Sequence, residues 1–205
     1  MMTTLTVLMT ALTPPPALAG DAPEAPEFAT VGELAPPFTL RDLDNKEVKL
    51  EDFEGQVVVL EWFNPDCPFV KFAHGETEPL RELPTRLTDD GAVWLAINSG
   101  AHGKQGNGLQ RNREALEEYA IDYPVLLDES GAVGRRYQAT STPHIYIIDE
   151  EGTLVYRGAL DSTPMGRGNG APLDHALDAF ESVKADKPVP TPETRPYGCN
   201  IKYGS

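Results

Sequence analysis

The sequence predicts one α/β domain with a central mixed β-sheet, helices on both faces and an N-terminal β-hairpin. Residues 57–63 form an apolar run interrupted only by Glu61, which is typical of a strand buried on both faces of a sheet. Further apolar runs alternate with helical patterns along the chain, an order that indicates strands covered by helices. Residues 38–52 read as two short strands around a turn at Asp44-Asn45.

The remaining elements follow in order. The pattern predicts a helical stretch over residues 68–87, broken or kinked at Gly75, Pro79 and Pro84, and then a strand over 93–97. Residues 98–108 are expected to lack regular structure, and an exposed helix is expected over 109–120. Short elements should follow at 125–127 (strand) and 131–137 (helix). An apolar strand that Thr142-Pro143 opens and that runs to Ile148 should then pair with a strand over 153–156. The last helix is expected over 173–183, with Leu173, Ala176, Leu177 and Phe180 on its buried face.

Composition limits the function classes. The chain has 205 residues and a net charge of −15, from 17 basic and 32 acidic residues. Phosphate binding needs clusters of Lys and Arg, so we do not expect a nucleic-acid partner. No apolar run approaches the roughly 20 residues of a membrane-spanning helix. The Gly-rich residues 98–108 lack the Gly-Lys-Ser/Thr of a phosphate-binding loop.

The N-terminus resembles a secretory signal peptide over residues 1–19, with Ala17-Leu18-Ala19 as the small-x-small cleavage pattern. No Lys or Arg precedes Arg41, so a tail without defined structure is the alternative. We expect export, to the periplasm, with a cytoplasmic protein as the second option. The expected organisation is then a linker over 20–30, the main domain over 31–184 and a C-terminal tail over 185–205 that carries Cys199.

Cys67 is the strongest candidate for chemistry. The strand over 57–63 is followed by Asn64-Pro65-Asp66, which favours a turn, and Pro68 suits the first turn of a helix. Cys67 should therefore lie at a helix N-terminus, where the helix dipole and unpaired N–H groups favour the nucleophilic thiolate. Asp66 should oppose the thiolate and Lys71 should favour it. The alternative is an inert, buried cysteine.

The strings NPDCPFVK and TRPYGCNIKY resemble bacterial redoxin-domain proteins of the thioredoxin-like superfamily, related to TlpA and to the AhpC/TSA peroxiredoxins. The resemblance covers residues 31–205 and implies a thioredoxin-like fold. It also implies a cis peptide bond at Thr142-Pro143, facing Cys67. Two positions depart from the relatives. Val70 stands where thioredoxins carry a second cysteine, and Asn64 stands where peroxiredoxins carry Thr or Ser.

The same resemblance suggests further site residues. Glu61 lies six residues before Cys67, where thioredoxin keeps a buried carboxylate that relays protons, so it is a candidate general base. The alternatives are a Glu exposed at a sheet edge or an ion-pair partner of Lys or Arg. Thr142, Pro143, His144 and Asn64 are candidate substrate-binding residues. No cofactor and no metal site are expected, because the two cysteines are 132 residues apart and no zinc-type spacing occurs.

Cys199 is the second cysteine. It could resolve an intermediate formed at Cys67, form a permanent disulfide with it, or act as an independent thiol. Three functions follow: a thiol–disulfide oxidoreductase, a peroxide reductase, or a non-enzymatic domain with a structural Cys67–Cys199 disulfide. The expected partners are a protein disulfide or dithiol, or a peroxide, together with an external thiol reductant.

Overall fold

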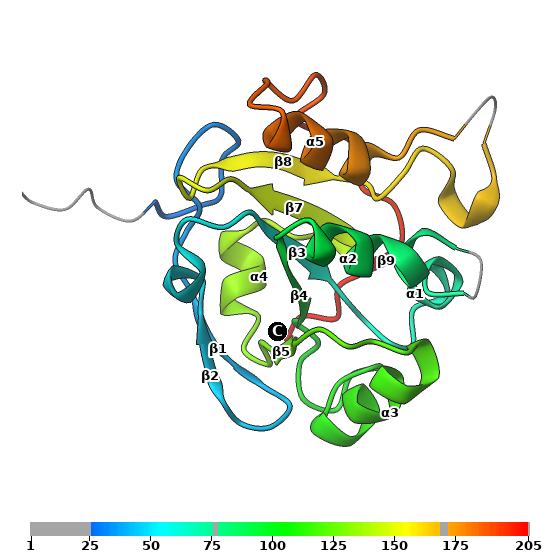
Figure 1. Ribbon diagram of the computed structural model, residues 1–205. Coiled ribbons are helices and arrows are strands. Elements are labelled where there is room, and N and C mark those ends of the chain that lie inside the picture. Colours follow the sequence, from blue (N-terminus) through cyan, green and yellow to red (C-terminus); the bar gives the residue numbers. More distant parts are fainter. Residues whose placement is uncertain (1–25, 76–77, 169–171, 205) are drawn as a thin grey trace, which may run out of the picture.

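The computed structural model describes residues 26–75, 78–168 and 172–204 (Figure 1). A seven-stranded sheet has the order β2-β1-β5-β4-β3-β7-β8, and β6 and β9 form a separate two-stranded ribbon. The strands are β1 (Thr39–Asp42), β2 (Glu47–Lys49), β3 (Val58–Trp62), β4 (Val93–Asn98), β5 (Val125–Leu127), β6 (Ser141–Thr142), β7 (His144–Ile148), β8 (Leu154–Gly158) and β9 (Cys199–Asn200). The helices are α1 (Pro68–Ala73), α2 (Pro79–Asp89), α3 (Leu109–Tyr119), α4 (Ala132–Arg136) and α5 (His175–Lys184), with 3₁₀ turns η1 (Leu50–Phe53) and η2 (Pro164–Gly166).

The sheet is mixed, as the sequence predicts. Strands β3, β4 and β5 are parallel, whereas β7 pairs antiparallel with β3 and β8 pairs antiparallel with β7. The N-terminal hairpin β1–β2 joins the other side of the sheet through β5. Asn45 has a φ of 63° in the hairpin turn, a conformation that Asn tolerates better than most residues. The predicted hairpin and its turn are therefore confirmed.

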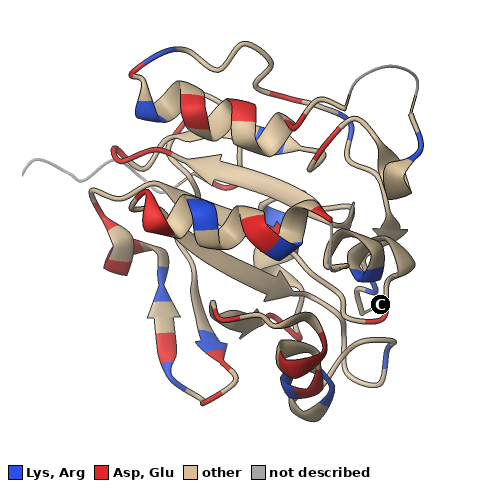
Figure 2. Ribbon diagram, turned by 45° about the vertical axis from the view of Figure 1, so that its right-hand side comes forward, with Lys and Arg blue, Asp and Glu red and all other residues tan. Residues whose placement is uncertain are grey.

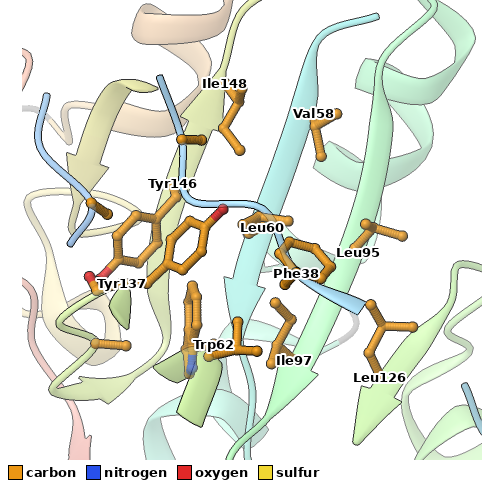
Figure 3. Packing of buried hydrophobic residues seen from close by; sticks show 14 of the residues in the cluster. Phe38, Val58, Leu60, Trp62, Leu95, Ile97, Leu126, Tyr137, Tyr146 and Ile148 are labelled. Atoms are coloured by element: carbon orange, nitrogen blue, oxygen red, sulfur yellow. Dashed lines mark hydrogen bonds between the residues drawn. The ribbon is translucent and has the colours of Figure 1, made fainter. Parts of the chain in front are cut away.

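Each face of the sheet has its own hydrophobic core. Side chains alternate along β3, so Val58, Leu60 and Trp62 point to the face that α4 covers. Figure 3 shows Trp62 there beside Tyr137 and Tyr146, with ring centroids 5.3 and 4.8 Å away. Val57 and Val59 point to the opposite face, where α2 and α5 supply the other half of the core. Helices thus lie on both faces, as expected for this fold class.

A third cluster of buried side chains extends the second face toward α1 and α3. In this cluster Cys67, the N-cap residue of α1, and Val70 of α1 pack with Ala115 and Tyr119 of α3 and with Ala96 of β4. Helix α3 is exposed along most of its length, as predicted, but it also buries one face that the prediction did not include. Its buried positions, Asn112, Ala115 and Tyr119, recur at helical spacing, but two of them are polar or amphipathic, which hid the buried face.

Two helix boundaries differ from the prediction. Helix α5 begins at His175 rather than Leu173, because the Asp174 side chain accepts a hydrogen bond from Leu177 N and caps the helix. Leu173 is consequently outside the helix and 55% exposed, so its predicted burial is wrong. Pro84 lies inside α2 without ending it, and the predicted break occurs only between Ala73 and Pro79.

The loop over residues 98–108 is more ordered than the sequence indicates. Buried Asn98 donates to Gly106 O (2.8 Å) and to Asn112 Oδ1 (3.0 Å), and Asn112 donates to Gly108 O (2.8 Å). Buried backbone carbonyl groups need hydrogen-bond donors, and beyond Asn98 no described strand pairs with this loop to supply them. The amide side chains of Asn98 and Asn112 supply these donors instead. The loop lacks regular secondary structure, as predicted, but these hydrogen bonds order it.

The first described residues and the C-terminal tail also pack on the domain. Within the expected linker, Ala29 is fully buried, and its N–H donates to Arg136 O. Residues 1–19, expected to form a signal peptide, lie outside the described residues. At the other end, the C-terminal tail returns along β8 and adds β9 to β6, as the red segment in Figure 1 shows.

Charged side chains lie mainly on the helices, the hairpin and the loops, whereas the central strands are largely uncharged (Figure 2). Glu61 is the exception among the central strands, because it is charged and fully buried on β3. Within the described part of the chain, no helix has both the length and the apolar character needed to cross a membrane.

Candidate active site

Cys67 is the N-cap residue of α1, and Pro68 occupies the first helical position, as the sequence predicts. The Cys67 side chain is fully buried, and its Sγ donates to Thr142 O at 3.1 Å. A thiol is a weak donor, so this bond holds the protonated sulfur against the backbone of β6. Loss of the proton would release this contact and leave the sulfur at the N-terminus of α1, where unpaired N–H groups favour negative charge.

The Asn64 side chain stabilises the turn that precedes Cys67. Its Oδ1 accepts from Asp66 N (2.9 Å), and its Nδ2 donates to Gln105 O (3.2 Å). The side chain is only 3% exposed, so both polar atoms serve the turn rather than open solvent. The loop over 98–108 thereby fixes the backbone that presents Cys67.

Arg111 of α3 completes this turn. Its Nε lies 2.8 Å from Asp66 Oδ1, and its Nη2 donates to Pro65 O at 3.2 Å. The guanidinium lies beside the acidic residue that precedes Cys67, and opposite charges at this range offset each other's fields. The expected opposition of Asp66 to a thiolate is therefore reduced by a residue that the sequence analysis did not single out.

The Thr142–Pro143 peptide bond is cis, which confirms the sequence prediction, and Thr142 O contacts the Cys67 sulfur. The side chains of Ser141 and Thr142 are buried, and their hydroxyls have no hydrogen-bond partner among the described residues. Pro143 lies between β6 and β7, where its missing N–H costs no ladder bond.

His144 lies in the interior rather than at a rim. It is 4% exposed, with its ring centroid 4.5 Å from that of Tyr146 and its Nδ1 3.3 Å from the Tyr146 hydroxyl. Burial, and secondarily the nearby positive charge of Arg157, lowers the pKa of His144 to about 3. His144 is thus a neutral side chain near pH 7.

Glu61 is fully buried on central strand β3, which removes the alternative of an edge-exposed carboxylate. Its Oε1 lies 3.0 Å from His74 Nε2, and its Oε2 accepts from Trp94 Nε1 (3.3 Å) and the Tyr123 hydroxyl (3.2 Å). Burial, followed by the charge of Glu61, raises the pKa of Tyr123 well above its ordinary value, which keeps that hydroxyl a donor. None of the hydrogen bonds of Glu61 among the described residues reaches Cys67.

Cys199 lies beside Cys67. In the β6–β9 ribbon Cys199 is the register partner of Thr142, whose carbonyl accepts from Cys67, and Cys199 packs against the cluster that contains Cys67. Neither cysteine is in a disulfide. Burial, and then the neighbouring Cys67 thiol, raises the pKa of Cys199 to about 11, so Cys199 keeps its proton at neutral pH.

The tail reaches this position because of Gly198. Its φ is +130°, and a Cβ there would collide with Thr142 O. Only glycine allows such a close approach to the Thr142–Pro143 backbone. The tail and the cis-proline turn therefore fit together at the residue just before Cys199.

The structure brings Cys67, Cys199, Thr142 and Pro143 together, with Asn64 one turn behind them. The hydrogen bonds of Glu61 and His144 go to other side chains, and none of those found among the described residues reaches a cysteine sulfur. His74, the C-cap residue of α1, is the hydrogen-bond partner of Glu61. Arg157, a conceivable cation for peroxide chemistry, is occupied by Ala29 O and Glu193. Among the described residues, no group of three acidic, His or Cys side chains could hold a metal ion.

This combination defines a thioredoxin-like protein: a mixed sheet, a cysteine at the start of the helix that follows a central strand, and a cis-proline against the sulfur. The chain belongs to the AhpC/TSA family, whose family model matches residues 31–157.

Relatives carry related names. The chain is 24% identical to thiol-disulfide oxidoreductase ResA of Bacillus thuringiensis subsp. konkukian, over 63% of this chain and 69% of that protein. It is 29% identical to thioredoxin peroxidase of Echinococcus granulosus, over 75% of this chain and 82% of that protein. A solved structure of an uncharacterized conserved protein from Geobacillus kaustophilus is 31% identical, with a TM-score of 0.76, and covers 85% of this chain and 93% of that one.

Proposed function

We propose that this chain is a thiol–disulfide oxidoreductase in which Cys67 is the nucleophile and Cys199 the resolving cysteine. The observation that carries the proposal is the position of Cys199 in β9, opposite Thr142 and beside the sulfur of Cys67. The second cysteine that thioredoxins keep in α1 is Val70 here, so the tail supplies a thiol that the helix lacks. The names of the relatives, which include a thiol-disulfide oxidoreductase, agree with this class of chemistry.

The reaction has two exchange steps. The Cys67 thiolate attacks one sulfur of a partner's disulfide, which forms a mixed disulfide and releases the partner's other sulfur as a thiolate. Cys199 then loses its proton and attacks the Cys67 sulfur. This step forms the Cys67–Cys199 disulfide and releases the partner's first sulfur as a thiol. An external dithiol reduces the Cys67–Cys199 bond and returns the protein to its starting state.

The surrounding residues fit defined roles in this scheme. The high pKa of Cys199 suits a thiol that stays protonated until Cys67 has reacted, so the two sulfurs would act in order. Thr142 and Pro143 lie where a partner disulfide must approach Cys67, and Asn64 positions the turn that carries it. Glu61 would act on Cys67 only indirectly, through His74 and the packing of α1.

A peroxide reductase is the second candidate, supported by the family and by a relative named thioredoxin peroxidase. In that reaction Cys67 would become a sulfenic acid and condense with Cys199, releasing water. Two observations weigh against it: Asn64 uses both polar atoms in the turn, and Arg157 is paired elsewhere.

A redox titration read by mass spectrometry tests the proposal. We expect one intramolecular Cys67–Cys199 disulfide that a dithiol reduces, with a midpoint above about −300 mV. A bond that stays oxidised down to about −300 mV would make the pair a structural staple. Absence of an intramolecular bond under oxidation would exclude Cys199 as the resolving cysteine.

Trapping separates the two enzymatic candidates. The Cys199→Ser variant should accumulate a mixed disulfide with a disulfide-bonded protein, whereas Cys67→Ser should accumulate none. A peroxide reductase would instead form a sulfenic acid on Cys67 of Cys199→Ser at low peroxide, faster than it exchanges with disulfides. If Glu61 acts as a proton relay, Glu61→Gln should change the pH profile of exchange and not only its rate.

We also propose that the protein is exported to the periplasm. The Ala17-Leu18-Ala19 pattern supports this location, and disulfide chemistry persists best in an oxidising compartment. N-terminal sequencing of the protein recovered from a periplasmic fraction should begin at Gly20. An uncleaved N-terminus in the cytoplasmic fraction would contradict it.

A further inference from the structure

We propose that residues 197–204, here called the C-terminal strap, form a gate over Cys67. The strap must leave before an external disulfide reaches the sulfur, and an extended segment of the partner polypeptide then takes its place along β6. This inference rests on the proposed exchange reaction and adds its substrate class and its control.

The nucleophile is completely buried, and the strap is part of what covers it. Cys67 has no exposed surface, although its proposed reaction needs contact with a sulfur from outside the chain. Above it, Cys199 and Asn200 pair with Thr142 and Ser141, and the Tyr197 ring lies 6.0 Å from that of Phe69 in α1. The described conformation is therefore a closed one, and opening requires movement of the strap.

Besides its pairing with β6 and the hydrogen bond from Ala101 N to Lys202 O, the strap is held at its far end, on α4. Arg135 Nη2 donates to Gly204 O (2.7 Å), and its guanidinium carbon lies 4.5 Å from the Tyr203 ring centroid. The Tyr203 hydroxyl donates to Ala139 O (2.8 Å). Gly134 leaves room for this ring, because a Cβ there would collide with the Tyr203 hydroxyl. These contacts form a latch remote from both sulfurs.

The chain just before the strap is anchored independently. Thr194 Oγ1 lies 2.7 Å from the Tyr156 hydroxyl and accepts from Ala159 N at 2.8 Å. The residues just after this anchor, 195–198, which include the first two residues of the strap, line a groove of about 700 Å³ together with Ser141 and Asp161. A segment that borders open space can rotate without disturbing the core. The strap can therefore lift while residues up to Thr194 stay in place.

The conformation of the strap indicates what kind of partner could bind β6 in its place. It lies as a strand, with Ile201 N donating to Thr140 O (3.1 Å) and a cysteine opposite Thr142. When the strap leaves, β6 exposes the same backbone groups, which an extended chain can satisfy by strand addition. A partner in this register would place its cysteine sulfur against Cys67, and the residue before that cysteine must be small because it faces Thr142 O.

The gate also depends on the redox state. In the Cys67–Cys199 disulfide the strap is tied covalently over the site, so the oxidised protein excludes further polypeptide from β6. Reduction by the external dithiol, which itself becomes a disulfide, breaks that bond and returns both cysteines to thiols. The strap is then held only by noncovalent contacts, namely the latch, the β6–β9 pairing and the backbone hydrogen bonds of Ile201 and Lys202. Polypeptide access would then follow reduction.

Alkylation of Cys67 by iodoacetamide in the Cys199→Ser protein tests the gate without any substrate. Arg135→Ala removes a charge-assisted hydrogen bond that holds the strap closed, so a larger fraction of molecules should have an open strap. The rate of Cys67 alkylation should therefore increase about tenfold. Arg136→Ala is the matched control, since Arg136 lies on the same helix but donates to Pro26 O and Pro37 O. Tyr203→Phe should give a smaller increase, because it removes only the hydroxyl. Equal rates in Arg135→Ala and Arg136→Ala would overturn the gate.

A synthetic peptide with the sequence of residues 195–204, its cysteine activated as a mixed disulfide with thionitrobenzoate, tests strand addition to the Cys199→Ser, Arg135→Ala protein. The Cys67 thiolate attacks the peptide sulfur, a Cys67–peptide disulfide forms, and coloured thionitrobenzoate leaves. Ile201→Pro in the peptide removes the N–H that Thr140 O accepts, and Gly198→Ala introduces the collision with Thr142 O. Both altered peptides should react at least about fivefold more slowly.

The outcomes distinguish the gate from the proposed function. Equal rates for the three peptides would show that Cys67 takes small disulfides without strand pairing, and would overturn the choice of partner. If the wild type exchanges protein disulfides but Arg135→Ala changes nothing, the gate fails and the function stands. If Arg135→Ala opens Cys67 but no disulfide ever reacts, the gate stands and the function fails.

Discussion

Glu61 is a buried carboxylate that the fold satisfies with three donors from different elements. His74 follows α1, Trp94 lies on β4, and Tyr123 precedes β5. An ionised group in the interior is tolerated only when its hydrogen-bonding capacity is filled, and here both oxygens are occupied. The residue therefore couples the helix that carries Cys67 to two strands of the sheet.

We predict that Glu61→Ala lowers the free energy of unfolding by about 3–5 kcal/mol, because it leaves buried donors without an acceptor. Glu61→Gln keeps one oxygen in place and should cost less. Urea denaturation of the reduced proteins measures both. If both variants match the wild type, Glu61 is not a structural acceptor.

His144 supplies a pH-dependent contribution to stability. Its pKa is about 3 in the folded protein, below the ordinary value of about 6.5 that applies after unfolding. Between these values the unfolded chain binds a proton that the folded chain does not. The contribution is therefore complete above about pH 6.5 and falls by about 1.4 kcal/mol per pH unit as the pH drops toward 3.

We predict that His144→Asn flattens this part of the stability profile, whatever its effect on absolute stability. The measurement is the midpoint of urea unfolding at several values between pH 4 and 7. His102→Asn is the control, since His102 is exposed and should leave the slope unchanged. A parallel profile for His144→Asn and wild type would contradict the assignment.

At the scale of elements, α3 and the preceding loop act on the cysteine turn from outside it. Gln105, Asn64 and Asp66 are joined by hydrogen bonds, and Arg111 pairs with the Asp66 carboxylate, which precedes Cys67. The Asp66 and Arg111 side chains are 30% and 21% exposed, so solvent and salt screen this pair only in part. Helix α3, through Arg111, therefore affects the electrostatic potential at the Cys67 sulfur.

We predict that Arg111→Ala slows alkylation of Cys67 several-fold at pH 7 in the Cys199→Ser protein, because Asp66 then opposes the thiolate without compensation. Adding Asp66→Asn should restore most of the rate. Arg113→Ala is the matched control on the same helix, as its partner Asp44 lies on the hairpin. If Cys67 is still alkylated slowly in the Arg111→Ala, Asp66→Asn double variant, the cause is a distorted turn rather than a charge effect.

At the scale of the whole molecule, the two sulfurs join the start of α1 to the end of the chain. The bond would close a loop between positions 67 and 199, a separation of 132 residues. Cross-linking so distant a pair removes many conformations from the unfolded chain, worth about 4–5 kcal/mol when the native geometry accepts the bond. Because β9 already holds Cys199 beside Cys67, the folded chain needs little rearrangement.

We therefore predict that the oxidised protein is more stable than the reduced protein by about 4–5 kcal/mol. Chemical unfolding with and without a reductant provides the comparison, and Cys199→Ser should show no difference between the two conditions. A gain near zero would mean that closing the bond strains the strap or the turn before α1.

Most of the fold could be predicted because its elements depend on local patterns. Buried strands such as β3 are marked by apolar runs, the hairpin by Asp44-Asn45, and the start of α1 by a turn followed by Pro68. The incorrect or incomplete predictions concern places where polar side chains occupy buried positions or cap a helix. A buried Asn and a buried Tyr hide the inner face of α3, and a capping Asp moves the start of α5. Buried amides also order the loop over 98–108, which lacks regular structure as predicted.

By itself the sequence determined the fold class, the position of Cys67 at a helix start and, by resemblance, the cis-proline opposite it. These depend on periodicity and on backbone restrictions that act over a few residues. Only the tertiary structure decided that Glu61 pairs with His74, that Arg111 reaches Asp66 across 45 positions, and that the tail forms a strand over Cys67. The physical reason is that such contacts depend on which elements become neighbours when the whole core is packed, and no local pattern encodes that adjacency.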